Sequence, residues 1–185
     1  MHKDLPTSAA YSSSSSGSAT EPADSIRMTA SNIQIRPFQS GDEKAFRQLN
    51  EEWIAKHFNM EEKDHVTLGD PVGKILKPGG HIFIAVADGE PIGCCALLAM
   101  KPGEFELAKM AVAERHRGHG VGRKVLQYTI EQARALGARR LYLETSSKLP
   151  NAIHLYESVG FRHLPPERLT PSPYARSDVY MEMLL

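Results

Sequence analysis

Apolar residues follow two spacings along the chain: alternation with polar residues in some segments, and recurrence every three or four positions in others. Alternation and short apolar runs predict strands, whereas the longer spacing predicts amphipathic helices. Strands are predicted within residues 32–38, 81–87, 90–100, 104–112, 139–145 and 178–185, with a short one from Phe161. Helices are predicted within residues 40–58, 61–80, 121–137 and 151–160. This order is typical of a mixed α/β sheet, in which 178–185 would be an edge or terminal strand.

Turn signals separate these segments. Asp88 and Gly89 stand between two apolar runs, the strongest short-range signal for a hairpin, and Lys-Pro-Gly at 101–103 predicts the next turn, so the strands around them form a β-meander. Gly137 falls where a C-terminal glycine ends a helix, and Asp42 is the expected N-cap of the first helix. The predicted apolar stripe of that helix consists of Ala45, Phe46, Leu49, Trp53 and Phe58.

Length and composition indicate one globular domain. A chain of 185 residues is long enough for a single core, and 41% hydrophobic and 24% charged residues are ordinary for a globular protein. Its 22 basic residues balance 22 acidic ones, so we expect neither nucleic acid nor a membrane surface as partner. Any anion site must therefore be local. No apolar run reaches the ~18 residues of a spanning helix.

Residues 1–30 differ from the rest in composition. They are rich in serine and poor in apolar groups, which predicts a disordered tail before a domain over residues 31–185; the alternative is a docked regulatory arm. The segment lacks the apolar stretch of a secretory signal, and its acidic residues disfavour a transit peptide. The only cysteines, Cys94 and Cys95, would point to opposite faces of one strand and could not easily form a disulfide. This favours a cytoplasmic location.

A glycine-rich turn precedes the third predicted helix. Gly118, Gly120 and Gly122 stand at every second position, where glycine lets backbone N–H groups converge on an anion beside a helix N-terminus. The basic residues around the turn are Arg115, Arg117, Arg123 and Lys124. Phosphate or pyrophosphate is the expected ligand; the alternative is glycines that serve only a tight turn.

Two familiar phosphate loops do not fit. A Walker A loop requires Lys followed by Ser or Thr, where this chain has Arg123 and Lys124. A Rossmann fingerprint requires a third glycine where Arg123 stands, and it belongs to a parallel βαβ unit rather than to the end of a meander.

With these motifs, the chain resembles the GNAT superfamily of acyl-CoA-dependent N-acetyltransferases. Its central signature, a strand followed by Arg/Gln-x-x-Gly-x-Gly/Ala and a helix, matches residues 115–120, and a second signature matches 141–161. The start at 33–42 is also similar, so the resemblance spans 33–185. It implies a mixed, mostly antiparallel sheet, splayed between its fourth and fifth strands and flanked by about four helices.

The resemblance also implies acetyl-CoA in that split. Its pyrophosphate would contact Arg117, Gly118, His119, Gly120, Val121, Gly122 and Arg123. Met110, Ala111 and Val112 of the fourth strand would lie beside the acetyl group, with the pantetheine arm pairing with the backbone of that strand. Asn151 matches an asparagine that often touches the pantetheine; the alternative is a plain helix cap.

Two residues are candidates for the proton transfers of amine acetylation. Tyr156 occupies the family position whose phenol serves as general acid, unless its hydroxyl lies at the surface. Glu106 is the first candidate for general base, because period-two alternation places it on one face with Ala108 and Met110. An ordinary exposed strand carboxylate is the alternative for Glu106, and Glu144 is the second candidate for the base.

Other chemistry-bearing residues receive weaker interpretations. Trp53 is predicted in the core rather than in an acceptor pocket, and His57 could relay protons. His116 and His119 lack a carboxylate or cysteine companion, so no metal site is predicted. We expect an N-acetyltransferase acting on a small primary amine, with a protein or peptide N-acetyltransferase and a non-catalytic acyl-CoA sensor as alternatives. The sequence leaves the oligomeric state open, a homodimer included.

Overall fold

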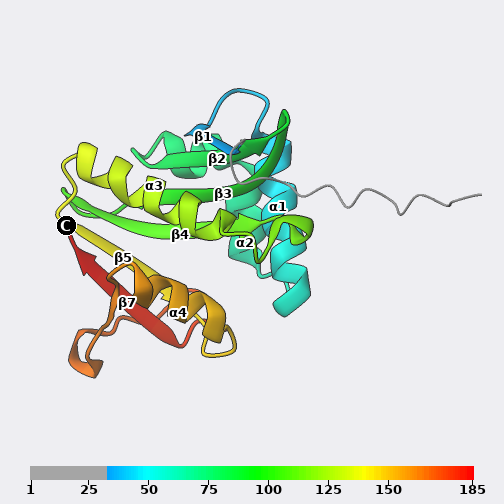
Figure 1. The fold of residues 1–185 in the computed structure, drawn as a ribbon. Coiled ribbons are helices and arrows are strands. Elements are labelled where there is room, and N and C mark those ends of the chain that lie inside the picture. The colour runs from blue at the N-terminus through cyan, green and yellow to red at the C-terminus, as the bar shows by residue number, and fades with distance from the viewer. Residues whose placement is uncertain (1–32) are drawn as a thin grey trace, which may run out of the picture.

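The computed structural model describes residues 33–185; residues 1–32, and with them the predicted tail 1–30, lie outside the described residues. The elements are β1 (Ile33–Pro37), α1 (Glu43–His57), α2 (Glu62–Gly69), η2 (Val72–Leu76), β2 (His81–Ala87), β3 (Glu90–Ala99), β4 (Glu104–Val112), η3 (Glu114–His116), α3 (Val121–Ala135), β5 (Arg140–Thr145), α4 (Pro150–Ser158), β6 (Arg162–His163), η4 (Pro166–Arg168) and β7 (Val179–Leu184). The strands and long helices follow the predicted order, and the short η helices lie between them (Figure 1).

One sheet contains all these strands in the order β1-β2-β3-β4-β5-β7-β6. Neighbours are antiparallel except β4 and β5, which run parallel. β4 pairs with β5 only over 104–106, opposite 140–142, and the rest of β4 has no partner on β5. The predicted splay between the fourth and fifth strands is thus confirmed, and Figure 1 shows the two strands diverging. β7 is the terminal strand of the chain but not an edge, because β6 pairs with its outer side.

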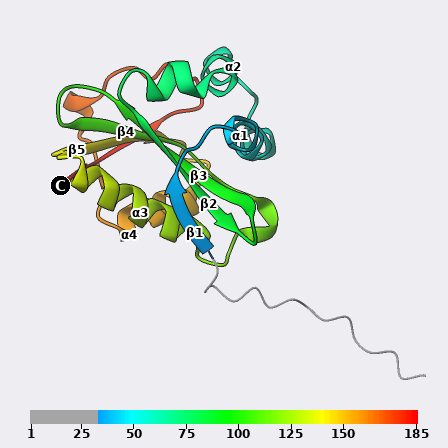
Figure 2. The same ribbon diagram turned by 90° about the horizontal axis from the view of Figure 1, so that it is seen from above.

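The core has two parts, one on each face of the sheet. α1 and α2 cover one face and α3 the other (Figure 2). The α1-side core contains Phe46, Leu68 and Cys94, whereas the α3-side core contains Leu126 and Cys95. The prediction for the cysteines is confirmed, because the two neighbouring thiols are free and buried in opposite cores.

The turns predicted at Asp88-Gly89 and Gly137 are confirmed, whereas Asp42 occupies its predicted position without the capping hydrogen bond. Asp88 and Gly89 both have positive φ, 51° and 80°, as a two-residue hairpin turn requires. Gly137 has φ 77° and its N–H bonds to the carbonyl of Arg134 at the end of α3. Asp42 stands at the N-cap of α1 without capping it: its carboxylate instead accepts hydrogen bonds from Arg36 and from the backbone N–H of Gln39.

The buried stripe of α1 differs in part from its prediction. Phe46 and Leu49 are buried as expected, and Ile54 is buried although it was not predicted. Trp53 and Phe58 are only half-buried. The helical spacing locates the inward face, but Trp53 is only partly buried where it packs against that core.

Candidate active site

β4 carries a bulge next to the split. Residues 94–96 of β3 lie opposite residues 108–111 of β4, so β4 has one residue too many in this stretch. Lys109 has φ 51°, a left-handed conformation that is uncommon for a residue other than glycine. The bulge therefore places an uncommon backbone conformation where β4 has already left β5.

The bulge reverses the alternation of side chains along β4. Leu107 packs into the α3-side core before the bulge, and Met110 and Val112 pack against the same core after it, whereas Ala111 joins the α1-side core. The prediction that Glu106 and Met110 share one face is wrong for this reason: the extra residue shifts the period-two pattern by one position.

The glycine turn opens onto a cavity of about 660 Å³. Gly118 and Gly120 have φ of 75° and 79°, and a Cβ at either position would meet nothing within 4 Å. The side chain of Arg117 donates to the carbonyl oxygen of Val112 over 2.8 Å, which ties the turn to the end of β4. The predicted cofactor residues that line this cavity are Met110, Ala111, Val112, Arg117, Gly118, Gly120, Gly122, Arg123 and Asn151.

Two predicted cofactor residues lie elsewhere. The His119 side chain is exposed outside the cavity lining, and that of Val121 is buried in the α3-side core, which leaves only their main chain for a ligand. Asn151 lies in the first turn of α4, after Leu149 at the N-cap, so the helix-cap alternative is wrong.

A second cavity of about 110 Å³ adjoins the first. It is lined by Glu106, Glu144 and Lys109, together with aromatic side chains of α1 and of the segment before β7. The residues shared by both cavities are Trp53, Met110, Leu149, Ala152 and Tyr156. Trp53 is thus a pocket residue as well as a neighbour of the core, which corrects its prediction.

Glu106 lies where the sheet splits. It is the last residue of β4 that pairs with β5, opposite Tyr142. Burial raises the pKa of its carboxyl, and the nearby charge of Glu144 raises it further. Among residues 33–185 no hydrogen bond or ion pair ends on its carboxylate, which lines the smaller cavity, while the nearby charges of Lys63 and Lys109 act against the rise in its pKa. The exposed-strand alternative is wrong.

Glu144 faces the same cavity from β5 but is already engaged. Its carboxylate accepts a hydrogen bond of 3.0 Å from the Tyr142 hydroxyl and another from the hydroxyl of Ser172. Glu144 is thus already bonded to two hydroxyl donors, whereas no hydrogen bond of the described residues ends on Glu106.

Tyr156 stands between the two cavities. Its ring packs edge-on against Phe161, with centroids 5.9 Å apart, and burial raises the pKa of its phenol. Its hydroxyl takes part in no hydrogen bond among residues 33–185, and the residue is half-buried rather than on the surface. A phenol in this state keeps its proton at neutral pH and can donate it.

A buried ion cluster forms the far wall of the smaller cavity. Asp64 of α2 accepts hydrogen bonds from Lys109 at 2.7 Å and from both terminal nitrogens of Arg176. Lys109 also donates to the Tyr174 hydroxyl at 2.9 Å. We call Asp64, Lys109, Tyr174 and Arg176 the Asp64 cluster. Burial alone would raise the pKa of Asp64, but the hydrogen bonds from Arg176 and Lys109 lower it to about 2.

Sequence reasoning missed the Asp64 cluster. Its members are separated by up to 112 positions, and no local spacing connects them. The one local signal is that Asp64 follows Glu61 by three residues, and these two form the reciprocal capping box of α2.

The histidines contribute little to the site. His57 lines the larger cavity, and burial together with the charge of Arg117 lowers its pKa. His116 is buried while His119 is exposed.

Among residues 33–185, no three His, Cys, Asp or Glu side chains are grouped so that they could hold a metal ion. None of the helices within that range is long and apolar enough to cross a membrane.

Comparison with known proteins agrees with this geometry. The chain is 36% identical over 91 residues to the uncharacterized N-acetyltransferase YjgM of Escherichia coli, covering 48% of this chain and 54% of that protein. It is 35% identical over 106 residues to human N-acetylaspartate synthetase, covering 54% of this chain and 34% of that protein. The match thus spans about half of the bacterial relative and about a third of the human one.

Solved structures share the fold. A GNAT-family acetyltransferase from Staphylococcus aureus has a TM-score of 0.74 at 19% identity, covering 82% of this chain and 98% of that chain. N-acetylglutamate synthase from Neisseria gonorrhoeae, in complex with coenzyme A and N-acetyl-glutamate, has a TM-score of 0.62 at 20% identity, covering 83% and 35%. The model of the acetyltransferase (GNAT) family matches residues 32–161, most of the chain. The chain therefore belongs to the GNAT family of acetyltransferases, which use acetyl-CoA.

Proposed function

We propose that this chain transfers the acetyl group of acetyl-CoA to a primary amine of a small molecule, by direct attack in a ternary complex. The observation that carries the proposal is the junction of the two cavities at Tyr156 and Met110. One cavity follows the glycine turn and the other contains Glu106. Ligands in the two cavities would therefore meet beside one proton donor and near one proton acceptor.

The larger cavity fits a cofactor with a pyrophosphate. The space that a Cβ of Gly118 or Gly120 would fill is open, so backbone N–H groups can approach an anion at the N-terminus of α3. Arg117 and Arg123 line the same space. The unpaired edge of β4 offers backbone groups to an amide-bearing arm. When bound, acetyl-CoA supplies an acetyl group activated as a thioester.

We assign the removal of a proton from the amine and the protonation of the sulfur to one residue each, Glu106 and Tyr156. An alkyl amine with a pKa of about 10 is protonated at neutral pH, so Glu106 takes its proton before the nitrogen attacks the acetyl carbon. Backbone N–H groups of β4 polarise the acetyl carbonyl. Tyr156 gives its hydroxyl proton to the sulfur as the carbon–sulfur bond breaks and the carbon–nitrogen bond forms. The amide nitrogen then loses its second proton to the Tyr156 phenolate, and Glu106 releases the first proton to solvent. No covalent bond to the enzyme is needed.

The size of the smaller cavity supports a small acceptor. Its volume is about 110 Å³, and Trp53, Phe58 and Tyr174 contribute to its walls. A peptide acceptor would require an open groove instead. N-acetylaspartate synthetase is a relative whose name gives a small acetylated product. A ribosomal-protein-alanine N-acetyltransferase from Brucella melitensis shares the fold at a TM-score of 0.64 and 19% identity, so peptides belong in the test.

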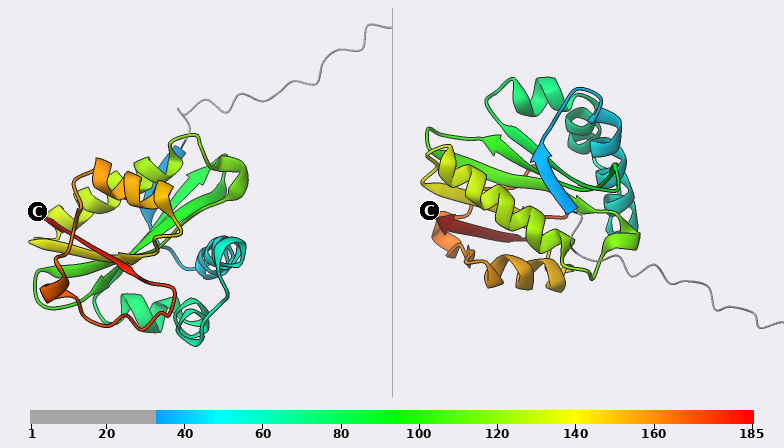
Figure 3. Two further views of the ribbon diagram at one scale, coloured as in Figure 1. Left: turned by 90° about the horizontal axis from the view of Figure 1, so that it is seen from below. Right: turned by 45° about the horizontal axis from the view of Figure 1, so that its top comes forward.

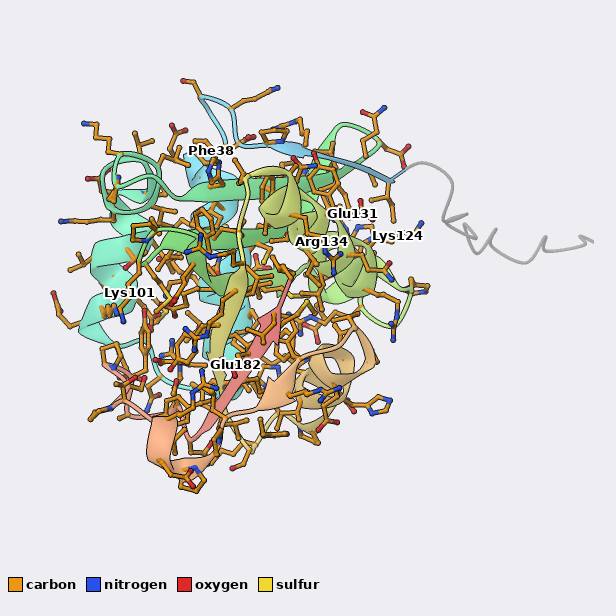
Figure 4. The ribbon with its side chains drawn as sticks, turned by 90° about the vertical axis from the view of Figure 1, so that its left-hand side faces the viewer. Phe38, Lys101, Lys124, Glu131, Arg134 and Glu182 are labelled. Atoms are coloured by element: carbon orange, nitrogen blue, oxygen red, sulfur yellow. The ribbon has the colours of Figure 1, made fainter. Side chains whose placement is uncertain are left out.

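The test is release of coenzyme A thiol by the full chain with acetyl-CoA and a panel of amino acids, diamines, polyamines and short peptides. Glu106→Gln and Tyr156→Phe should each lower kcat by about 100-fold, the usual contribution of a general acid or base, with little change in acetyl-CoA affinity. Glu131→Gln, an exposed carboxylate on α3 (Figure 4), is the control and should turn over normally.

Three outcomes would contradict the proposal. Normal turnover by both variants would show that Glu106 and Tyr156 are not the acid and base. Turnover of peptides alone would indicate a peptide acetyltransferase. Acetyl-CoA binding without turnover of any amine would indicate a sensor.

A further inference from the structure

The Asp64 cluster joins the two halves of the split sheet. Asp64 and Lys109 belong to α2 and β4, on the N-terminal side of the split, whereas Tyr174 and Arg176 belong to the segment that leads into β7. Figures 2 and 3 show this orange to red segment running beside α2. Lys109 lies beyond the last paired position of β4 and β5, so the contacts bridge the halves where the strands have already parted.

Lys109 is the residue at which β4 bulges. Glycine or asparagine usually occupies a left-handed position, because other side chains disfavour it. Here the Lys109 side chain is only 7% exposed, and its ammonium is held by the Asp64 carboxylate and the Tyr174 hydroxyl. The Tyr174 ring also lies 4.9 Å from that ammonium. The side-chain contacts thus stabilise a backbone conformation that the residue would not adopt by preference.

The bulge determines how the next residues meet the split. After the bulge, the side chains of Met110 and Val112 face the α3 side and line the larger cavity. Ala111 also lines this cavity, although its side chain belongs to the α1-side core. A regular strand would exchange the faces of these residues. The direction of their backbone groups therefore depends on the conformation at Lys109.

Asp64 is itself held firmly. It is fully buried, its carboxylate forms the capping box of α2 with Glu61, and Arg176 binds both Asp64 and Glu61. Loss of the Lys109 ammonium would leave Asp64 paired with Arg176, so no buried charge would be without a partner. A variant at Lys109 can therefore fold.

We propose that Lys109 is a positioning residue, whose ammonium, anchored by Asp64 and Tyr174 across the split, fixes the β4 bulge and the direction of the backbone of Met110, Ala111 and Val112. The kinetic consequence rests on the proposed function. The effect on the backbone does not, because it follows from the contacts alone.

The test compares Lys109→Met with Arg140→Met. Arg140 is a partly buried cation, 19% exposed, that pairs with Glu104 and Glu182 at the closed end of the split. Figure 4 labels Glu182 on β7. Both variants should lower Tm. Only Lys109→Met should speed amide hydrogen exchange in residues 108–112, by about tenfold, and lower kcat by about tenfold. Coenzyme A affinity should change by less than about threefold, because the glycine turn is intact.

Several outcomes separate positioning from a merely structural role. Lys109→Arg should restore much of kcat, since its guanidinium can reach Asp64. Lower Tm with wild-type exchange and wild-type kcat would overturn the proposal. If Lys109→Met does not fold, Tyr174→Phe removes one bond of the ammonium and should give a smaller change in the same direction; no change there also overturns it. If the wild type turns over no amine, the proposed function fails, and exchange in residues 108–112 still decides the role of Lys109.

Discussion

Replacing Gly120 by alanine separates the binding role of the glycine turn from its backbone role. Gly120 is the N-cap of α3 with φ 79°, a conformation that costs an alanine about 1–2 kcal/mol. The added Cβ meets no atom of the chain within 4 Å, so the folded protein contains no clash. For a domain of this size, that cost lowers Tm by about 2–8 °C.

Gly120 lines the larger cavity, where we propose that the pyrophosphate binds, so the added Cβ would compete with the pyrophosphate for space. We expect the Kd for acetyl-CoA to rise at least about tenfold, which corresponds to about 1.4 kcal/mol. Isothermal calorimetry with coenzyme A on the folded variant measures this.

Gly137→Ala is the matched control. Gly137 has φ 77° and likewise nothing within 4 Å of a Cβ, but it lies at the other end of α3 and lines neither cavity. It should lose similar stability and keep wild-type affinity. Unchanged affinity in folded Gly120→Ala, or an equal loss in Gly137→Ala, would refute the assignment of the turn to the pyrophosphate.

Three further predictions follow from charge and burial. Glu144→Gln should move the acid limb of the kcat/KM profile to lower pH, because the charge of Glu144 contributes to the raised pKa of Glu106; an unmoved limb means that Glu106 is not the base. The pKa of Asp64 is lowered to about 2 from its ordinary value of 3.8. Its ionised carboxylate therefore stabilises the fold fully above about pH 4, and this stabilisation is lost as the pH falls to about 2. In thermal melts over this pH range, Asp64→Asn should lose about 2 kcal/mol less stability than the wild type. Burial raises the pKa of the Cys95 thiol to about 12 and also raises that of Cys94, so neither should react with a thiol reagent until denaturant is added; fast reaction of the native chain would contradict the two buried positions.

The sequence predicted those parts of the fold and site that local chemistry determines. The hairpin at Asp88 and the end of α3 at Gly137 follow from residues that permit positive φ, so a short window was enough. The glycine turn was located for the same reason. The individual contacts of the turn could not be predicted, because the sequence pattern does not show that the Val121 side chain is buried in the core.

Features held by distant residues could not be predicted. The bulge at Lys109 gives no local signal, because β4 reads as a regular strand and lysine is not a residue associated with positive φ; the face of Met110 was wrong as a result. Its anchors Asp64 and Tyr174 lie 45 and 65 positions away. Trp53 was assigned to the core because helical spacing identifies the inward side of a helix. The spacing does not show how far along that side the buried surface extends.

The split in the sheet is fastened at both ends. At the closed end, Arg140 on β5 bonds Glu104 on β4 and Glu182 on β7 over 2.9 and 2.7 Å. At the open end, the Asp64 cluster spans the gap from α2 to the segment before β7. We therefore expect the opening to keep its width when a ligand enters, so that little reorganisation of the chain would oppose the affinity of that ligand.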